Sequence, residues 1–168
     1  MIVVCDTTPI SYLIQIELID LIPRLFGTAC LPSAVLHELQ HPNAPTVVRS
    51  WVEALPSWVS IYRPGPIKSP LLLGLHIGER EALAIAEKLQ ADFVLTDDFK
   101  ARKVAHQLGI DTLTTLLILD AAADRGWLDF QATLRLLLQT NFRVDQLTVD
   151  QLIEKHSRKT IAPDPTGR

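Results

Sequence analysis

Short apolar runs recur along this chain and alternate with longer segments in which apolar residues return every three or four positions. Runs such as Ile2-Val3-Val4-Cys5 are typical of buried strands in a parallel sheet. We predict strands over residues 2–6, 28–31, 58–62, 92–96 and 110–113. The longer segments predict helices, and the alternation of the two patterns indicates an α/β fold.

Proline and glycine set several boundaries of the predicted helices. Residues 9–26 form one broken helix or two, because Pro23 suits the first turn of a second helix. Gly78 precedes a helix that ends near Gln90, and residues 63–70 form the clearest loop. The other predicted helices cover residues 33–40, 46–55, 99–108, 115–125, 130–140 and 146–156.

The composition of the 168 residues fits one domain with a sizeable core, since 48% are apolar and 21% are charged. We predict that residues 1–157 form this domain and that residues 158–168 form a flexible tail. No run is long and uncharged enough to span a bilayer, so we expect a cytoplasmic protein that does not associate with a membrane.

The cysteines and the net charge narrow the possible chemistry. Cys5 and Cys30 lack the spacing of a metal site and are expected to be buried thiols. The net charge of −3 shows no overall excess of basic residues of the kind that nucleic-acid-binding proteins have. A nucleic-acid substrate would therefore have to be held by a local group of basic residues and by a metal ion.

Acidic residues end two of the predicted strands. Asp6 follows the first apolar run, and Asp97 and Asp98 follow the run over residues 92–96. In open α/β sheets, ligands bind outside the carboxyl ends of the strands. Three further acids lie on the predicted helices: Glu38, Glu79 and Glu81. Carboxylates gathered at one edge repel one another unless a cation binds, and hard oxygen ligands suit Mg²⁺ or Mn²⁺.

Each of these acids also has an ordinary structural explanation. Asp6 suits the N-cap of a helix, and Glu38 suits a solvated helix face. Glu79 and Glu81 lie in the first turn of their helix, where acids interact favourably with the helix dipole. On a helical wheel Glu79 lies roughly 50° from the centre of the apolar stripe and Glu81 roughly 110°. We therefore predict that Glu79 points inward.

Four stretches together resemble the PIN-domain family, and specifically its toxin-like bacterial branch related to VapC-type ribonucleases. They follow one another in the family's order and cover residues 4–10, 32–39, 78–86 and 95–102. The resemblance extends over roughly residues 2–140. It implies a three-layer PIN-like fold, in which helices flank a central, mostly parallel sheet of four to five strands, with extra helices at the C-terminus.

The resemblance also implies which residues form the active site. The catalytic acids would be Asp6, Glu38, Glu79, Asp97 and Asp98, and Glu81 joins them as a metal ligand. Thr7, Thr8 and Thr96 would support these acids, although the family usually has Ser or Asn where Thr8 stands. One or two Mg²⁺ or Mn²⁺ ions would assist hydrolysis of RNA phosphodiester bonds, which leaves a 5′-phosphate. Four cations would contact backbone phosphates, with surface ion pairing as the alternative: Lys100, Arg102, Lys103 and Arg80.

The partners implied by the resemblance are an RNA substrate, a small antitoxin protein and a second copy of the chain. An apolar stripe predicts the homodimer or antitoxin interface, unless the C-terminal helices cover it: Leu13, Ile14, Leu18, Leu21 and Ile22. Two other functional classes stay open. A phosphatase of the haloacid-dehalogenase type would need an Asp where Thr8 stands. A non-catalytic PIN-fold module would bind RNA or protein without cleaving it.

Overall fold

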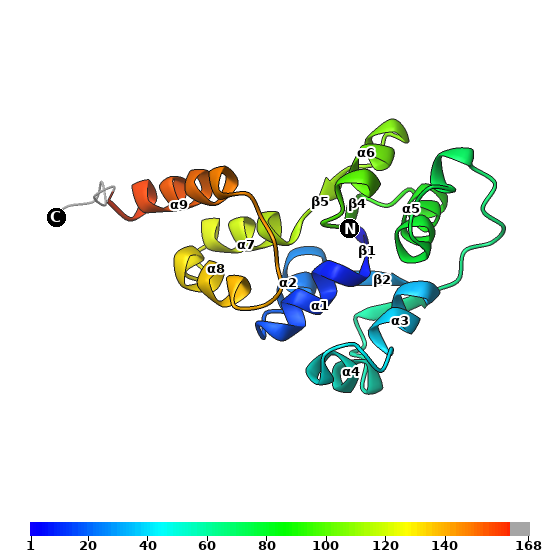
Figure 1. The fold of residues 1–168 in the computed structure, drawn as a ribbon, viewed down its shortest axis with the longest axis horizontal. Coiled ribbons are helices and arrows are strands. Elements are labelled where there is room, and N and C mark those ends of the chain that lie inside the picture. Colours follow the sequence, from blue (N-terminus) through cyan, green and yellow to red (C-terminus); the bar gives the residue numbers. More distant parts are fainter. Residues whose placement is uncertain (162–168) are drawn as a thin grey trace. The chain divides into compact units, whose positions relative to one another are not determined.

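Five parallel strands form one sheet in the first part of the chain (Figure 1). The computed structural model describes the backbone of residues 1–161 and the side chains of residues 1–158. Residues 1–115 form one compact unit, and a second unit starts at Leu116. The strand order is β3-β2-β1-β4-β5, with bounds β1 (Ile2–Cys5), β2 (Thr28–Pro32), β3 (Val59–Tyr62), β4 (Phe93–Leu95) and β5 (Thr112–Leu113). All five predicted strands are confirmed, and the sheet is entirely parallel.

Helices connect these strands at nearly the predicted places. They are α1 (Thr7–Gln15), α2 (Leu21–Phe26), α3 (Ser33–Leu39), α4 (Thr46–Glu53), α5 (Ile77–Leu89) and α6 (Phe99–Gln107). The segment 9–26 is thus two helices, and α1 begins at Thr7 rather than Pro9 because proline is tolerated in a first helical turn. The predicted loop ends in a short 3₁₀ helix, η1 (Pro70–Leu72), which the sequence pattern did not predict.

One face of the sheet packs against α5 and α6. Val4 of β1 pairs with Cys30 of β2 and with Val94 of β4, so these side chains share one face. They belong to a buried cluster with residues of α5 and α6: Ala82, Leu83, Ile85, Ala86, Ala101 and Ala105. The small alanines let α5 and α6 approach the sheet closely, which fixes where the first turns of both helices lie.

The opposite face of the sheet packs against α2. Phe93 pairs with Val3 and therefore points away from the face that carries Val4. The ring of Phe93 lies 6.1 Å from the ring of Phe26 in α2, centroid to centroid. With α5 and α6 on one face and α2 on the other, the predicted three-layer fold is confirmed.

The second unit holds the predicted C-terminal helices, which are α7 (Thr115–Asp124), α8 (Phe130–Leu138) and α9 (Gln146–Ile161). Helix α9 continues past the predicted end at His156, so residues 158–161 are helical and not part of a flexible tail. The remainder of that predicted tail, residues 162–168, lies outside the described residues. Within the described residues, no helix has both the length and the apolar character needed to cross a membrane.

The early apolar stripe is mostly buried. Leu13, Ile14, Leu21 and Ile22 are each at most 4% exposed, and Leu18 is half-buried. Burial of four of the five side chains agrees with the alternative that the stripe is covered within one chain, and the predicted interface stays a prediction. Both cysteines are free and buried, as predicted, and burial raises the pKa of the Cys30 thiol to about 11.

Candidate functional site

The carboxyl ends of β1 and β4 lie side by side, and the first predicted acid, Asp6, directly follows β1. The backbone N–H of Asp6 donates to the carbonyl of Leu95 over 2.9 Å. The Asp6 carboxylate caps α1 by accepting from the N–H of Thr7 at 2.8 Å, so its predicted capping role is confirmed. Its other oxygen accepts from the hydroxyl of Thr96 at 2.9 Å. These bonds hold a buried carboxylate at the carboxyl edge of the sheet.

Glu38 of α3 reaches the same edge. The hydroxyl of Thr7 donates to the Glu38 carboxylate, which links α3 to the residue after Asp6. A Cβ placed on Gly78 of α5 would lie 3.1 Å and 3.3 Å from the two Glu38 oxygens and 3.3 Å from Cγ2 of Val35. Glycine at this position therefore lets the first turn of α5 pass close to the Glu38 carboxylate.

Glu79 is held at this edge by the start of α5. It forms a capping box with His76, in which the Glu79 carboxylate accepts from the His76 backbone N–H at 3.0 Å. The helix consequently begins at Ile77 and includes Gly78, two residues earlier than we predicted. Burial raises the pKa of Glu79, and the negative charges of Asp98 and Glu38 raise it further.

Asp98 caps the next helix, α6. Its carboxylate accepts from the N–H of Ala101 at 2.7 Å, and its own N–H donates to the Thr96 hydroxyl at 3.3 Å. Thr96 therefore contacts both Asp6 and the backbone of Asp98. Because the charge of Asp98 acts on Glu79, the starts of α5 and α6 bring these two acids together.

Asp6 is the most buried of the four acids and responds most to its surroundings. Burial raises its pKa to about 6, although the bonds from Thr7 and Thr96 oppose the rise. The negative charges of Glu79 and Glu38 add to the effect of burial. Asp6, Glu38, Glu79 and Asp98 thus form one electrostatically linked group, which we call the acid group.

The other two predicted acids point elsewhere. Both oxygens of Asp97 accept from Thr115, one from its N–H at 2.8 Å and one from its hydroxyl at 2.6 Å. Glu81 accepts from the hydroxyl of Ser33 at 3.1 Å and from the N–H of Ala34 at 2.8 Å. Glu81 therefore caps α3 from a neighbouring helix, in keeping with its wheel position facing away from the stripe. We place Asp97 outside the acid group, since burial raises its pKa but none of the four acids contributes to that rise. We place Glu81 outside it, since its carboxylate is directed to the start of α3.

Of the predicted threonines and cations, some contact the acid group and others do not. Thr7 and Thr96 contact the acid group, whereas Thr8 is exposed and makes no side-chain hydrogen bond within the described residues. Lys100 donates to the carbonyl of Gly74. In the part of the chain that the structure describes, no acid lies within ion-pair distance of any of four cations: Arg80, Lys100, Arg102 and Lys103. Arg102 nevertheless has structural neighbours, since its charge opposes the rise in the pKa of Asp97 and its guanidinium lies 5.9 Å from the centroid of the Phe99 ring.

The acid group fits a divalent cation by the chemistry of its donors. Four carboxylates with hydroxyl support are hard oxygen ligands, and their mutual repulsion is the condition that a cation relieves. Their oxygens are spread out, because among the described residues no three of these acids have ligand atoms within 4.8 Å of one another. Mg²⁺ is usually held through one or two carboxylates and keeps several waters, so it suits such spacing.

A tighter group of ligand atoms lies in the second unit. Asp120, Asp124 and His156 have ligand atoms within 4.8 Å of one another. The ammonium of Lys155 lies 2.6 Å from a carboxylate oxygen of Asp120 and 3.1 Å from one of Asp124. The ammonium of Lys155 thus already contacts both aspartates and offsets one of their two negative charges, so we assign no metal ion to them.

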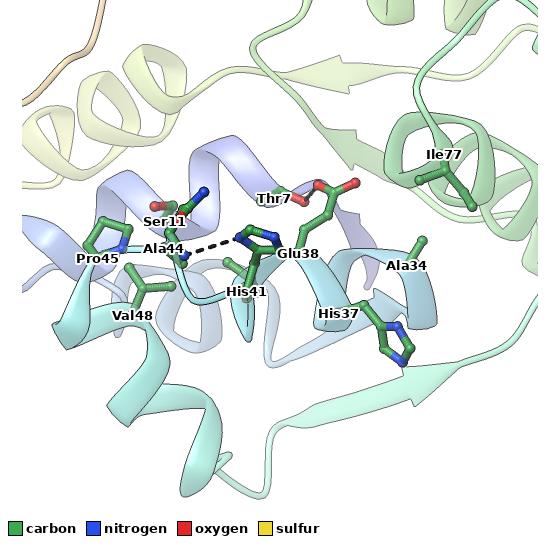
Figure 2. Close-up of a pocket in the computed structure, with 12 residues that line it drawn as sticks. Thr7, Ser11, Ala34, His37, Glu38, His41, Ala44, Pro45, Val48 and Ile77 are labelled. Atoms are coloured by element: carbon green, nitrogen blue, oxygen red, sulfur yellow. Dashed lines mark hydrogen bonds between the residues drawn. The ribbon is translucent and has the colours of Figure 1, made fainter.

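A pocket of about 530 Å³ adjoins the acid group (Figure 2). Thr7 and Glu38 line its edge, and its other walls come from α1, α3, α4 and the start of α5. Sequence patterns predicted neither this pocket nor the bond from Thr7 to Glu38. The one available signal for the close approach of α5 was Gly78 next to the acidic first turn, which we had interpreted as a helix boundary.

The comparison with protein families agrees with this geometry. A family model described as a PIN domain matches residues 2–158. Neither the curated proteins nor the solved structures include a match to this chain. The family match covers nearly the whole sequence and coincides with a five-stranded parallel sheet that carries acids at its carboxyl edge. The chain therefore belongs to the PIN-domain family, whose members are generally nucleases.

Proposed function

We propose that this protein is a metal-dependent endoribonuclease that hydrolyses phosphodiester bonds in RNA. The acid group carries the proposal, because the pKa values of Asp6 and Glu79 are raised by burial and by neighbouring carboxylates. Perturbed acids gathered at the carboxyl edge of a parallel sheet are typical of a functional site. Membership of the PIN-domain family supports the same reaction class.

The acid group would hold Mg²⁺ or Mn²⁺ through Asp6, Glu38, Glu79 and Asp98. A divalent cation bound there supplies a water that is deprotonated near neutral pH and balances charge on the phosphate. The hydroxyls of Thr7 and Thr96 orient Glu38 and Asp6, so that both carboxylates keep one geometry when no cation is bound. These hydrogen bonds reduce the reorganisation that cation binding requires.

Cations beside the acid group would hold the RNA backbone. Arg80 follows Glu79 on α5, and Lys100, Arg102 and Lys103 follow Asp98 on α6. Since these four form no ion pair within the described residues, their charges are available to phosphates. We further propose, on the resemblance to VapC-type proteins, that the RNA is cytoplasmic, that a small antitoxin restrains the enzyme and that the chain dimerises.

Cleavage of single-stranded RNA by the purified protein tests this function. We expect cleavage with Mg²⁺ or Mn²⁺, none with EDTA, and at least a hundredfold lower rate for Asp6→Asn, which removes a charge while keeping the shape. The matched control is Asp92→Asn, which lies at the amino end of β4, away from the acid group. A protein that cleaves no RNA with either metal would favour the non-catalytic binding module. An Asp6→Asn variant as active as wild type would refute the site.

A further inference from the structure

We propose that the pocket beside Glu38 binds one unpaired nucleobase of the RNA, next to the phosphate held at the acid group. This inference rests on the proposed function and extends it, because it assigns the part of the substrate that the acids and cations do not contact. The pocket's volume of about 530 Å³ is within the range of small-molecule sites. One wall of the pocket is shared with the acid group through Thr7 and Glu38.

The charges around the pocket favour a neutral ligand. No Lys or Arg lines it, and the Glu38 carboxylate at its edge repels any anionic group. The four cations described above lie instead on α5 and α6. The acid group therefore has cations on the helices that cover one face of the sheet, and beside it a pocket between α1, α3 and α4 that no Lys or Arg lines. An RNA strand has the same division, with anionic phosphates along its backbone and neutral bases projecting from it.

The walls of the pocket suit a flat ring. Leu39 and Val48 are buried at its base, and Pro45 and Ile77 present exposed apolar surface at its sides. Figure 2 shows Val48 and Pro45 on one side of the pocket and Ile77 on the other. Bases that leave a stack are held in this way, between apolar or aromatic side chains.

Polar groups at the mouth favour a base over an apolar peptide side chain. The backbone N–H of Asn43 donates to Nδ1 of His41 at 3.1 Å, which fixes the imidazole of His41 at the pocket mouth. The amide of Asn43 and the imidazole of His37 line the pocket and make no hydrogen bond within the described residues. An amide can donate and accept along the edge of a base, whereas an apolar side chain offers no hydrogen bond to either group.

Binding of two labelled probes tests the inference without relying on cleavage. The probes are a short single-stranded RNA and an abasic sugar–phosphate strand of equal length and charge, measured by fluorescence anisotropy with Ca²⁺ in place of Mg²⁺. We expect the RNA to bind wild-type protein about tenfold more tightly than the abasic strand. The double variant His37→Ala/Asn43→Ala should lose roughly five- to tenfold in RNA affinity and nothing in abasic affinity. Both positions are exposed, so we expect the variant to fold, and circular dichroism checks this.

A matched double variant, His106→Ala/Asn141→Ala, changes the same residue types at exposed positions outside the pocket and should bind both probes as wild type does. Equal affinity for the two probes, or unchanged RNA affinity in the pocket variant, would overturn the inference. A pocket variant that alters only self-association in sedimentation would also overturn it and assign the pocket to a protein partner. Base-dependent binding without cleavage would refute the nuclease function alone, and cleavage with base-independent binding would refute the base pocket alone.

Discussion

Replacing Asp6 with Asn should make the metal-free protein more stable at neutral pH. The pKa of Asp6 rises from 3.8 to about 6 in the folded chain, chiefly because the carboxyl is buried. A rise of this size corresponds to about 3 kcal/mol of unfolding free energy as an upper bound. Well below the unfolded-state pKa of 3.8 the carboxyl is protonated in both states, and the wild type keeps this stability. As the pH rises through 6 the folded protein must ionise a buried acid, and the stability is lost.

Thermal unfolding in EDTA, followed by circular dichroism, measures this effect. Asparagine keeps the oxygen that caps Thr7, and its NH₂ group can donate to the Thr96 hydroxyl where the carboxylate accepted from it. We expect the Asp6→Asn variant to melt roughly 6–12 °C above wild type at pH 7.5, and within about 2 °C of it at pH 4. Mg²⁺ should narrow the gap at pH 7.5, because a bound cation stabilises only the carboxylate. A variant that is equally stable or less stable than wild type at pH 7.5 would show that Asp6 is not under electrostatic repulsion.

Substitutions at three further positions separate structural roles from roles in the acid group. Glu81→Ala removes the acceptor of the Ser33 hydroxyl and the Ala34 N–H, and should cost about 2 kcal/mol, or roughly 4–8 °C in Tm. Glu79→Gln should abolish RNA cleavage with little change in Tm, and equal activity loss in Glu81→Gln would return Glu81 to the site. Gly78→Ala should leave Tm within about 3 °C, since higher helix propensity offsets crowding against Val35, yet lower cleavage at least tenfold by displacing Glu38. Unchanged cleavage in Gly78→Ala would show that the position of Glu38 is not critical.

The strands and the acids at their ends could be predicted from the sequence because both signals are local. An apolar run such as Phe93–Leu95 must be buried, and the residue that follows a parallel strand must lie at its carboxyl edge. The wheel position of Glu79 depended only on the apolar stripe of its own helix, and the structure places Glu79 near Asp98 and Glu38. Long apolar patterns likewise located the C-terminal helices.

Contacts between separate elements were beyond such patterns. Asp97 and Asp98 are adjacent in sequence, and only the position of Thr115 at the start of α7 explains why Asp97 turns from the acid group. Glu81 is a carboxylate and could bind a metal by its chemistry, but it accepts a hydrogen bond from the N–H of Ala34, which has no partner within its own helix. The early apolar stripe was predicted to form an interface unless other helices of the chain cover it, and Leu13 and Ile22 are fully buried within the chain. Each outcome depends on which partner a fold brings close.

Binding of Mn²⁺, followed by the loss of the free-ion signal in electron paramagnetic resonance, tests the central claim most directly. The claim is that Asp6, Glu38, Glu79 and Asp98 form one cation site. We predict that wild type binds Mn²⁺ and that replacing any of the four acids with its amide weakens binding at least tenfold. Asp97→Asn and Glu81→Gln should stay within about threefold of wild type, because their carboxylates bond to Thr115 and to α3. Binding that survives all four substitutions, or that is lost only with Asp120→Asn in the second unit, would contradict the claim.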